Sequence, residues 1–260
     1  MTGQADEYVF GQDEYDRIHA AEDLLDEGTK RLIERCGIAD GAICLEAGAG
    51  GGSIAQWLCG LVGATGRVVA TDLDVRALDQ LAEGNLEIRR HDIVTDDLEQ
   101  EHYDLVHARL FLEHLPERDA VLSKLARALR PGGFIVLESI DYVAAVPVSE
   151  LGAAEHAHAQ AVRLEAFTKL GLDVYLGRQL PARLRAAGLV EVGNEGRVFV
   201  MEGGSPGARW FRLSLSHLRA RLVDPGLLSD AEVDRVLELF DDPDWAAYSP
   251  IILGAWGRRP

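Results

Sequence analysis

Short apolar runs alternate with amphipathic segments along the first half of the chain. The runs that predict strands are 43–45, 67–71, 86–90, 103–108 and 134–137. Apolar residues recur at three- and four-residue spacing over 54–62, 75–81 and 121–129, the pattern of a helix with one apolar face. Strands that alternate with helices predict an α/β fold with a doubly wound parallel sheet.

The regions on either side follow a different pattern. Helical spacing over 13–36 predicts one or two helices with an acidic outer face. Beyond residue 141 the expected elements are helices at 147–170, 174–187, 205–222 and 229–240, and strands at 189–200 and 249–256. Ser229 and Glu232 have the spacing of a capping box, which predicts a helix start at Ser229.

A run rich in glycine separates the first predicted strand from the first helix of the alternating region. Gly48, Gly50 and Gly52 are spaced as G-x-G-x-G, and glycine lets a ligand approach the backbone because no Cβ is in the way. A dinucleotide loop has G-x-G-x-x-G, and Ser53 occupies its third glycine position here. Glu46 precedes the first glycine by two, where a pyrophosphate has no use for negative charge. A flexible turn of any α/β protein remains the alternative.

Asp72 ends the second predicted strand, 22 residues past Gly50. An acidic residue about 20 positions past the loop holds the ribose hydroxyls in nucleotide-binding folds. A role as helix N-cap fits Asp74 better than Asp72. The sequence therefore predicts that Asp72 binds a ribose.

Four motifs, in this order, resemble those of class I methyltransferases that use S-adenosylmethionine. They are Glu46-x-Gly-x-Gly-x-Gly, Asp104-Leu105-Val106, Leu112-Glu113-His114-Leu115-Pro116 and Leu129-Arg130-Pro131-Gly132-Gly133. The resemblance covers about residues 40–140. It implies a Rossmann-like, doubly wound sheet of seven strands with helical lid insertions, in which strand seven is antiparallel and lies in the edge region of the sheet.

The resemblance also implies the cofactor and the residues that bind it. S-adenosylmethionine carries a sulfonium and an ammonium group, so a carboxylate at Glu46 suits it. Leu73 is expected to lie against the adenine, Asp92 to accept from its amino group and the Ile93 N–H to cap a ring nitrogen. The expected cofactor residues are Glu46, Ala47, Gly48, Gly50, Asp72, Leu73, Asp92, Ile93 and Ala108.

These expectations divide one compact domain into three parts. Residues 1–36 form an N-terminal helical arm or lid, and residues 37–141 form the cofactor-binding half of the core. Residues 142–260 complete the core and contain two helical inserts, at about 142–170 and 203–247, which we expect to bind the acceptor because families on one fold differ in such insertions.

Composition and charge limit the classes of acceptor and the cellular compartment that we expect. The chain has 260 residues and a formal net charge of −17, and residues 1–27 carry nine acidic side chains against Arg17 alone. Such a field repels phosphate backbones and anionic lipid, so we expect no nucleic acid and no membrane as partner. Cys36, Cys44 and Cys59 lack C-x-x-C spacing, which predicts no metal site and suits a reduced cytoplasm.

Methyl transfer from a sulfonium needs a general base only if the acceptor must lose a proton early. His114 and Asp141, at predicted strand ends, are the candidate catalytic residues, although His114 fits a structural role equally well. Tyr8, Trp210 and Phe211 are candidate acceptor or lid residues, and a plain core role is their alternative. We expect a small, largely apolar acceptor, an aromatic compound or a natural product, methylated at oxygen, nitrogen or carbon.

Two other functions stay open at this point, and the oligomeric state is either monomer or homodimer. One is a protein that binds the cofactor without methylating. The other is a nicotinamide oxidoreductase, against which Glu46, Ser53 and the lack of a Tyr-x-x-x-Lys motif argue.

Overall fold

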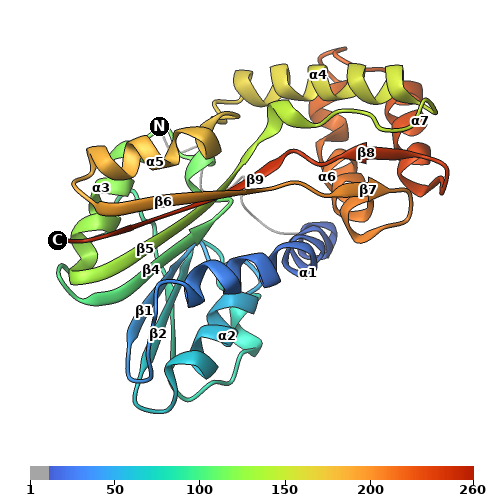
Figure 1. Ribbon diagram of the computed structural model, residues 1–260. Helices are drawn as coiled ribbons and strands as arrows, with labels where there is room; N and C mark the ends of the chain where they lie inside the picture. The colour runs from blue at the N-terminus through green and yellow to red at the C-terminus, as the bar shows by residue number, and fades with distance from the viewer. Residues whose placement is uncertain (1–11) are drawn as a thin grey trace.

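The computed structural model describes residues 12–260, and a seven-stranded sheet forms its centre (Figure 1). The strands lie in the order β3-β2-β1-β4-β5-β9-β6. Their bounds are β1 (Ile43–Ala47), β2 (Arg67–Asp72), β3 (Leu86–Arg90), β4 (Tyr103–Arg109), β5 (Leu129–Asp141), β6 (Val190–Arg197) and β9 (Ile251–Arg258). Strands β1 to β5 pair in parallel, and β9 is antiparallel to β5 and to β6. The predicted α/β fold with an antiparallel last strand is confirmed.

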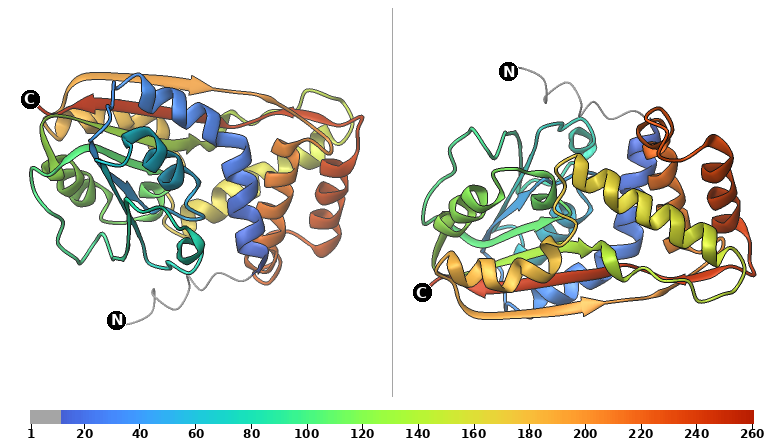
Figure 2. Two further views of the ribbon diagram at one scale, coloured as in Figure 1. Left: turned by 90° about the horizontal axis from the view of Figure 1, so that it is seen from below. Right: turned by 90° about the horizontal axis from the view of Figure 1, so that it is seen from above.

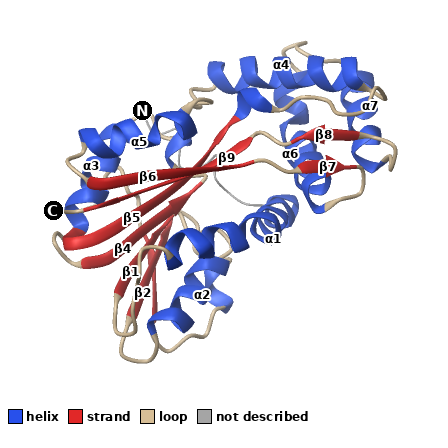
Figure 3. Cartoon of the chain, in the orientation of Figure 1, coloured by secondary structure: helices blue, strands red, loops and turns tan. Residues whose placement is uncertain are grey.

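The last strand, β9, is not itself at the edge of the sheet, because β6 lies outside it. β9 pairs along one side with β5, from Phe134↔Arg258 to Asp141↔Ile251, and along the other side with β6. Its mostly apolar sequence suits this place, because pairing on both sides buries the strand. β7 (Val200–Glu202) and β8 (Ala246–Tyr248) form a separate two-stranded sheet beside the helices of the second half (Figure 3).

Helices cover both faces of the large sheet. Figure 1 shows α1 and α2 on one face and α3 and α5 on the other. The helix bounds are α1 (Gln12–Glu34), α2 (Ser53–Val62), α3 (Arg118–Ala128), α4 (Ala153–Lys169), α5 (Leu176–Ala186), α6 (Pro206–Val223) and α7 (Asp230–Asp241). Among residues 12–260 there are also the short 3-10 turns η2 (Leu78–Gln80), η3 (Leu112–His114) and η4 (Tyr142–Ala144).

Neighbouring residues of each central strand point to opposite faces of the sheet, and both faces are apolar. In β1, Cys44 packs with α1 and α2, whereas Leu45 packs with α3 and α5. In β4, Leu105 and Val106 divide in the same way. A parallel sheet with helices on both faces needs strands that are apolar on both sides, which explains why these runs are continuous rather than alternating.

The two inserts pack against each other beyond the carboxyl ends of the strands. Helices α4, α6 and α7 share one apolar cluster with β8 and with the middle of α1 (Figure 2). Ser205 caps α6 by accepting from the Ala208 N–H, and Ser229 with Glu232 makes the predicted capping box at α7. The inserts therefore form one body that faces the ligand edge of the sheet.

One predicted helix is wrong. Residues 75–81 contain only the 3-10 turn η2 in place of a helix. The Asp74 carboxylate accepts from the Arg76 N–H at 3.1 Å, a local bond that competes with helical hydrogen bonding. The segment therefore crosses from β2 to β3 as a loop with one anchoring side chain, the buried Leu78.

A buried histidine joins three central strands. His107 of β4 has no exposed surface, and its Nδ1 lies 2.6 Å from Glu46 Oε2 on β1. Its Nε2 lies 3.6 Å from Glu138 Oε1 on β5. Burial opposes a charge on the ring, but the two carboxylates outweigh it and raise the pKa of His107 to about 9. The imidazolium is therefore the species between the two glutamates at neutral pH.

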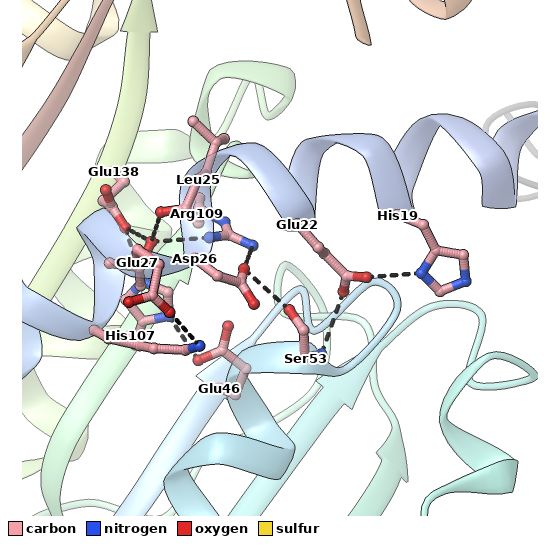
Figure 4. Close-up of polar contacts among 12 residues, drawn as sticks. His19, Glu22, Leu25, Asp26, Glu27, Glu46, Ser53, His107, Arg109 and Glu138 are labelled. Atoms are coloured by element: carbon pink, nitrogen blue, oxygen red, sulfur yellow. Dashed lines mark hydrogen bonds and ion pairs between the residues drawn. The ribbon is translucent and has the colours of Figure 1, made fainter. Parts of the chain in front are cut away.

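Helix α1 is tied to this histidine through Glu138. Thr29 donates to Glu138 Oε1, and Arg197 of β6 donates to Glu138 Oε2. Arg109 of β4 donates to Thr29 Oγ1 at 2.8 Å and to Asp26 Oδ1 at 2.9 Å (Figure 4). Because every one of these side chains has a charged or hydroxyl partner, the position of α1 over the sheet is specified by polar contacts as well as by packing.

The raised pKa of His107 predicts how stability depends on pH. The unfolded chain has a histidine pKa of about 6.5, so stabilisation by the imidazolium is complete below that pH. It is lost as the pH rises through the folded-state pKa of about 9. We expect the free energy of unfolding, measured with urea, to fall by on the order of 1–3 kcal/mol over this window.

The exposed His158 provides the control. His158→Gln should keep the wild-type dependence on pH, whereas His107→Gln should be less stable at low pH and lose most of the slope. If the wild-type free energy of unfolding stays level between about pH 6.5 and pH 9, His107 is not charged in the folded protein.

Candidate functional site

The glycine run forms the turn between β1 and α2. Gly48 has a φ of +72°, Gly50 of +57° and Gly52 of +90°, backbone conformations that glycine adopts without strain. The Gly48 N–H donates to the Thr71 carbonyl at 2.8 Å, and a Cβ at Gly48 would lie 2.7 Å from the Phe111 ring. The turn is thus held between the end of β2 and the segment that follows β4.

Asp72 stands at the end of β2 beside this turn. Its Oδ2 accepts from the Gly50 N–H at 2.9 Å, and its Oδ1 accepts from the Asp74 N–H at 3.1 Å. Burial raises the pKa of Asp72, although both N–H groups act in the other direction. Leu73, the next residue, keeps 39% of its surface exposed. A half-buried carboxylate beside an exposed apolar side chain suits a polar sugar joined to a flat base.

The remaining expected cofactor residues lie at the same edge of the sheet. The register pairs Ala47 with Thr71 and Asp72 with Arg90, so the carboxyl ends of β1, β2 and β3 coincide. Asp92 follows β3, is half-buried, and accepts from the Val94 N–H at 2.9 Å. Ile93 and Ala108 are buried, so their backbone rather than their side chains could meet a ligand.

Two acidic residues of α1 stand at the amino end of α2, and the sequence analysis did not single them out. Glu22 Oε1 accepts from the Ser53 N–H at 3.2 Å, and Glu22 Oε2 lies 2.8 Å from His19 Nδ1 (Figure 4). Asp26 Oδ1 accepts from Ser53 Oγ at 3.1 Å. The N-cap residue of α2 is a glycine without a side chain, so these carboxylates from another helix take the capping place. The signal was present as two acids four residues apart on a predicted helix.

Glu46, which we expected to bind the cofactor, also has a partner within the protein. Its Oε2 is bound to His107, so this carboxylate supports the sheet as well as bordering the glycine turn. With Glu22, Asp26 and Asp72 it places four carboxylates at this edge, of which Glu46 and Asp26 are paired with His107 and Arg109.

The turn after β4 contributes two titratable groups. Glu113 is 1% exposed, and neither carboxylate oxygen has a hydrogen-bond partner within residues 12–260. Burial raises the pKa of Glu113 to about 7. His114 keeps an exposed surface, but surrounding protein atoms and the Arg17 cation lower its pKa to about 4. His114 is therefore neutral at pH 7.

Asp141 does not lie open to a ligand. Arg178 of α5 donates to both of its oxygens, to Oδ1 at 2.7 Å, and the Val143 N–H donates to Oδ1 at 3.2 Å. Asp141 itself is 2% exposed. The structure thus makes Asp141 an ion-pair partner that joins the end of β5 to α5, and the catalytic role expected from the sequence stays a prediction.

The candidate acceptor residues lie in three different situations. Trp210 and Phe211 of α6 are each 4% exposed and belong to the apolar cluster of the inserts. Phe211 in addition lies against Arg163 of α4, whose Cζ is 5.1 Å from the centre of the Phe211 ring. Tyr8 lies outside the described residues. The sequence did not single out Arg163, because an arginine in a helix of mixed polarity is usually expected to face the solvent.

Two further findings concern classes of site. Within residues 12–260 there is no group of three or more His, Cys, Asp or Glu side chains that could hold a metal ion. None of the helices described has the length and apolar composition required to cross a membrane.

Residues 45–135 match a family model described as a methyltransferase domain. Curated relatives include the ubiquinone/menaquinone biosynthesis C-methyltransferase UbiE of Pseudomonas putida, 30% identical over 128 residues that cover 44% of this chain and 50% of the relative. Methyltransferase GfsG of Streptomyces halstedii is 33% identical over 119 residues, 43% of this chain and 42% of the relative. The chain thus matches about half the length of these relatives.

Solved structures support the fold over most of the chain. Phosphoethanolamine N-methyltransferase 2 of Haemonchus contortus, determined in complex with S-adenosyl-L-methionine, has a TM-score of 0.59 at 17% identity and covers 94% of this chain and 56% of its own. The YcgJ protein of Bacillus subtilis has a TM-score of 0.60 at 12% identity and covers 88% and 97%. The chain therefore shares the fold of these structures, and its residues 45–135 match the model of the methyltransferase domain.

Proposed function

We propose that the protein transfers a methyl group from S-adenosylmethionine to a small-molecule acceptor. The observation that carries this proposal is the Asp72 carboxylate, 2.9 Å from the Gly50 N–H at the carboxyl ends of β1 and β2. Ligands of open α/β sheets bind at this edge, and a carboxylate there serves a ribose diol. The methyltransferase domain match over 45–135 agrees with it.

The residues at this edge fit the charge and shape of the cofactor. A glycine turn leaves the backbone accessible, and Glu46, Glu22 and Asp26 suit a ligand that carries a sulfonium and an ammonium group. Asp72 would hold the ribose, Leu73 would pack against the adenine, and Asp92 with the Ile93 N–H would meet the polar edge of the base. When bound, the cofactor supplies an activated methyl group with its leaving group already in place.

The chain's part in the reaction is to orient the acceptor, exclude water and, for acceptors that need it, accept a proton. The inserts and α1 cover the edge of the sheet where the acceptor would lie, which favours alignment in a dry site. Glu113, with a pKa of about 7, is better matched than His114 to proton transfer at neutral pH.

Several features favour a small acceptor over a macromolecule. The net charge of −17 disfavours a nucleic acid. The relative UbiE is named for ubiquinone and menaquinone biosynthesis, and a small-molecule acceptor agrees with that name. Transfer is tested by mass spectrometry after incubation with S-adenosylmethionine and a panel of phenols, aromatic acids and amines; addition of one methyl group to a panel member supports the proposal.

The first prediction concerns cofactor binding. S-adenosylhomocysteine at about a hundred times its Kd should stabilise the chain by roughly 2.7 kcal/mol, seen as a raised melting temperature. NADH should cause no comparable shift. A response to NADH and none to S-adenosylhomocysteine would show that the site is a nicotinamide site.

A pair of glycine variants locates this binding. Gly50→Ala places a methyl group in the turn at a φ of +57°, 3.6 Å from Ile18 Cγ2, and should weaken S-adenosylhomocysteine binding about tenfold or more. Gly60→Ala, in the last turn of α2 with nothing within 4 Å of its Cβ, should leave affinity unchanged and stabilise the fold by about 0.5–1 kcal/mol. Equal affinities in the two variants count against the glycine turn as the binding site.

The second binding prediction concerns the ribose. Asp72→Asn removes the charge while keeping the size of the side chain, and Asp72→Ala removes the hydrogen-bond acceptors as well. Calorimetry should show a loss of about 1–3 kcal/mol of binding free energy for Asp72→Ala and a smaller loss for Asp72→Asn. Asp79→Ala, an exposed residue of η2, is the matched control. Unchanged affinity in Asp72→Ala removes this residue from the site.

A further inference from the structure

Arg163 is a buried cation without a carboxylate partner among residues 12–260. Its side chain on α4 is 6% exposed, and no ion pair joins it to any described acidic residue. Its guanidinium donates to Gln160 Oε1, and its Nε has no hydrogen-bond partner in the described chain. Buried arginines are almost always paired, because removing the charge from water is costly. Arg163 therefore needs an explanation.

The guanidinium is held in one orientation rather than left mobile. Gln160, which accepts from it, is itself fixed by donating its Nε2 to the Tyr142 carbonyl at 2.8 Å. The Arg163 Cζ lies 5.1 Å from the Phe211 ring and 5.9 Å from each of the Tyr142 and Phe167 rings. Tyr142 and Phe167 meet edge to face, with ring centres 5.3 Å apart. Three aromatic rings from η4, α4 and α6 thus surround one oriented cation.

Arg163 remains charged in these surroundings. Burial lowers its pKa to about 10, which still leaves the guanidinium protonated at pH 7. The Tyr142 hydroxyl cannot neutralise it, because burial and the nearby Glu113 raise the pKa of that phenol. The pKa of Glu113 is raised mainly by burial, and the charged groups that act on it are Asp173 and Arg118 rather than Arg163. Arg17 of α1, the other cation near Tyr142, is paired with Glu14.

This group lies at the edge of the sheet where the acceptor is expected. Tyr142 follows directly on the end of β5, and Glu113, in the turn after β4, is close enough to raise the pKa of the Tyr142 hydroxyl. Arg163 and Phe211 come from the two inserts, whose helices α4 and α6 are in contact. The aromatic cage of Tyr142, Phe167 and Phe211 around Arg163 is thus built where the inserts meet the carboxyl ends of β4 and β5.

We propose that Arg163 binds an anionic oxygen group, a carboxylate or a phosphate, of the methyl acceptor, and that the aromatic cage packs against the acceptor's unsaturated body. This inference rests on the proposed methyl transfer and specifies its substrate class. A guanidinium offers two parallel N–H donors that match a carboxylate or phosphate, and it also stacks on flat groups. The acceptor is then a small unsaturated acid anchored by one charge, rather than a wholly apolar molecule.

Probe binding to the full chain tests this directly. Benzoate, phenyl phosphate and the neutral benzamide are titrated by calorimetry, each with and without S-adenosylhomocysteine. We expect at least one anion to bind about tenfold or more tighter than benzamide. The two anions distinguish a carboxylate from a phosphate as the preferred group.

Variants assign the preference to Arg163. Arg163→Met keeps much of the stem and should weaken the preferred anion about 10- to 100-fold while leaving benzamide unchanged. Arg163→Lys keeps the charge but not the paired donors and should fall between wild type and Arg163→Met. Arg235→Met, an exposed arginine of α7 whose ion pair with Glu238 spans 3.5 Å, should bind the probes as wild type does.

Stability separates a binding role from a structural one. If Arg163 awaits a ligand, Arg163→Met replaces an uncompensated buried charge by an apolar group, so the ligand-free melting temperature should stay level or rise. If Arg163 were instead paired with a carboxylate of the chain, Arg163→Met would lower the melting temperature. The proposal is wrong if Arg163→Met lowers that temperature, if benzamide binds as tightly as the anions, or if the anion preference survives in Arg163→Met.

The cofactor measurement keeps the two proposals apart. Arg163→Met should bind S-adenosylhomocysteine as wild type does. If the wild type does not bind S-adenosylhomocysteine, the proposed function is wrong, and so is the identification of the anion as a methyl acceptor. An intact cofactor response without anion preference overturns only the role of Arg163.

Discussion

The buried contact of His107 with Glu46 and Glu138 is the constraint on which the arrangement of this molecule depends. It joins β1, β4 and β5 at the centre of the sheet, and through Glu138 it reaches Thr29 of α1. Removing any one of the three side chains would leave a buried charge or an unpaired acceptor, which costs far more than the pair contributes when intact. The cluster therefore acts mainly by specifying one position for α1.

That position brings the acidic face of α1 over the glycine turn. Arg109 links Thr29 to Asp26, and Asp26 and Glu22 contact Ser53 at the amino end of α2 (Figure 4). A helix amino end favours negative charge, so these contacts stabilise the protein without a ligand. They also surround the expected cofactor position with carboxylates, which suits a cation. Structural support and ligand recognition are thus served by the same few side chains.

On the side where the acceptor is proposed to bind, buried charged groups lack the partners that the charges near the glycine turn have. Around the glycine turn, nearly every charge has a partner, whereas Arg163 and Glu113 are buried with polar atoms left unsatisfied. Unsatisfied buried groups are rare because they destabilise the fold, and they concentrate where a ligand completes the hydrogen bonding. The charges around the glycine turn thus stabilise the fold, whereas Arg163 of the first insert and Glu113 after β4 are the groups that the proposed acceptor would satisfy.

The sequence alone determined the features that depend on local pattern. Apolar runs and helical spacing predicted the sheet, the glycine spacing predicted the turn at Gly48–Gly52, and the distance to Asp72 predicted the acid beside it. These predictions need only the period of a strand or helix and the conformational freedom of glycine, both of which neighbouring residues decide.

Only the tertiary structure decided which distant side chains meet. Glu46 and His107 are 61 residues apart, and Asp141 and Arg178 are 37 apart, so no local pattern indicates that either pair forms. The first pairing gave Glu46 a structural role, and the second made Asp141 an ion-pair partner of α5. Arg163 became a candidate only when three rings from three elements were found around it. The physical reason is that burial and partnership are properties of the packed chain, whereas a sequence records only which groups are available to pair.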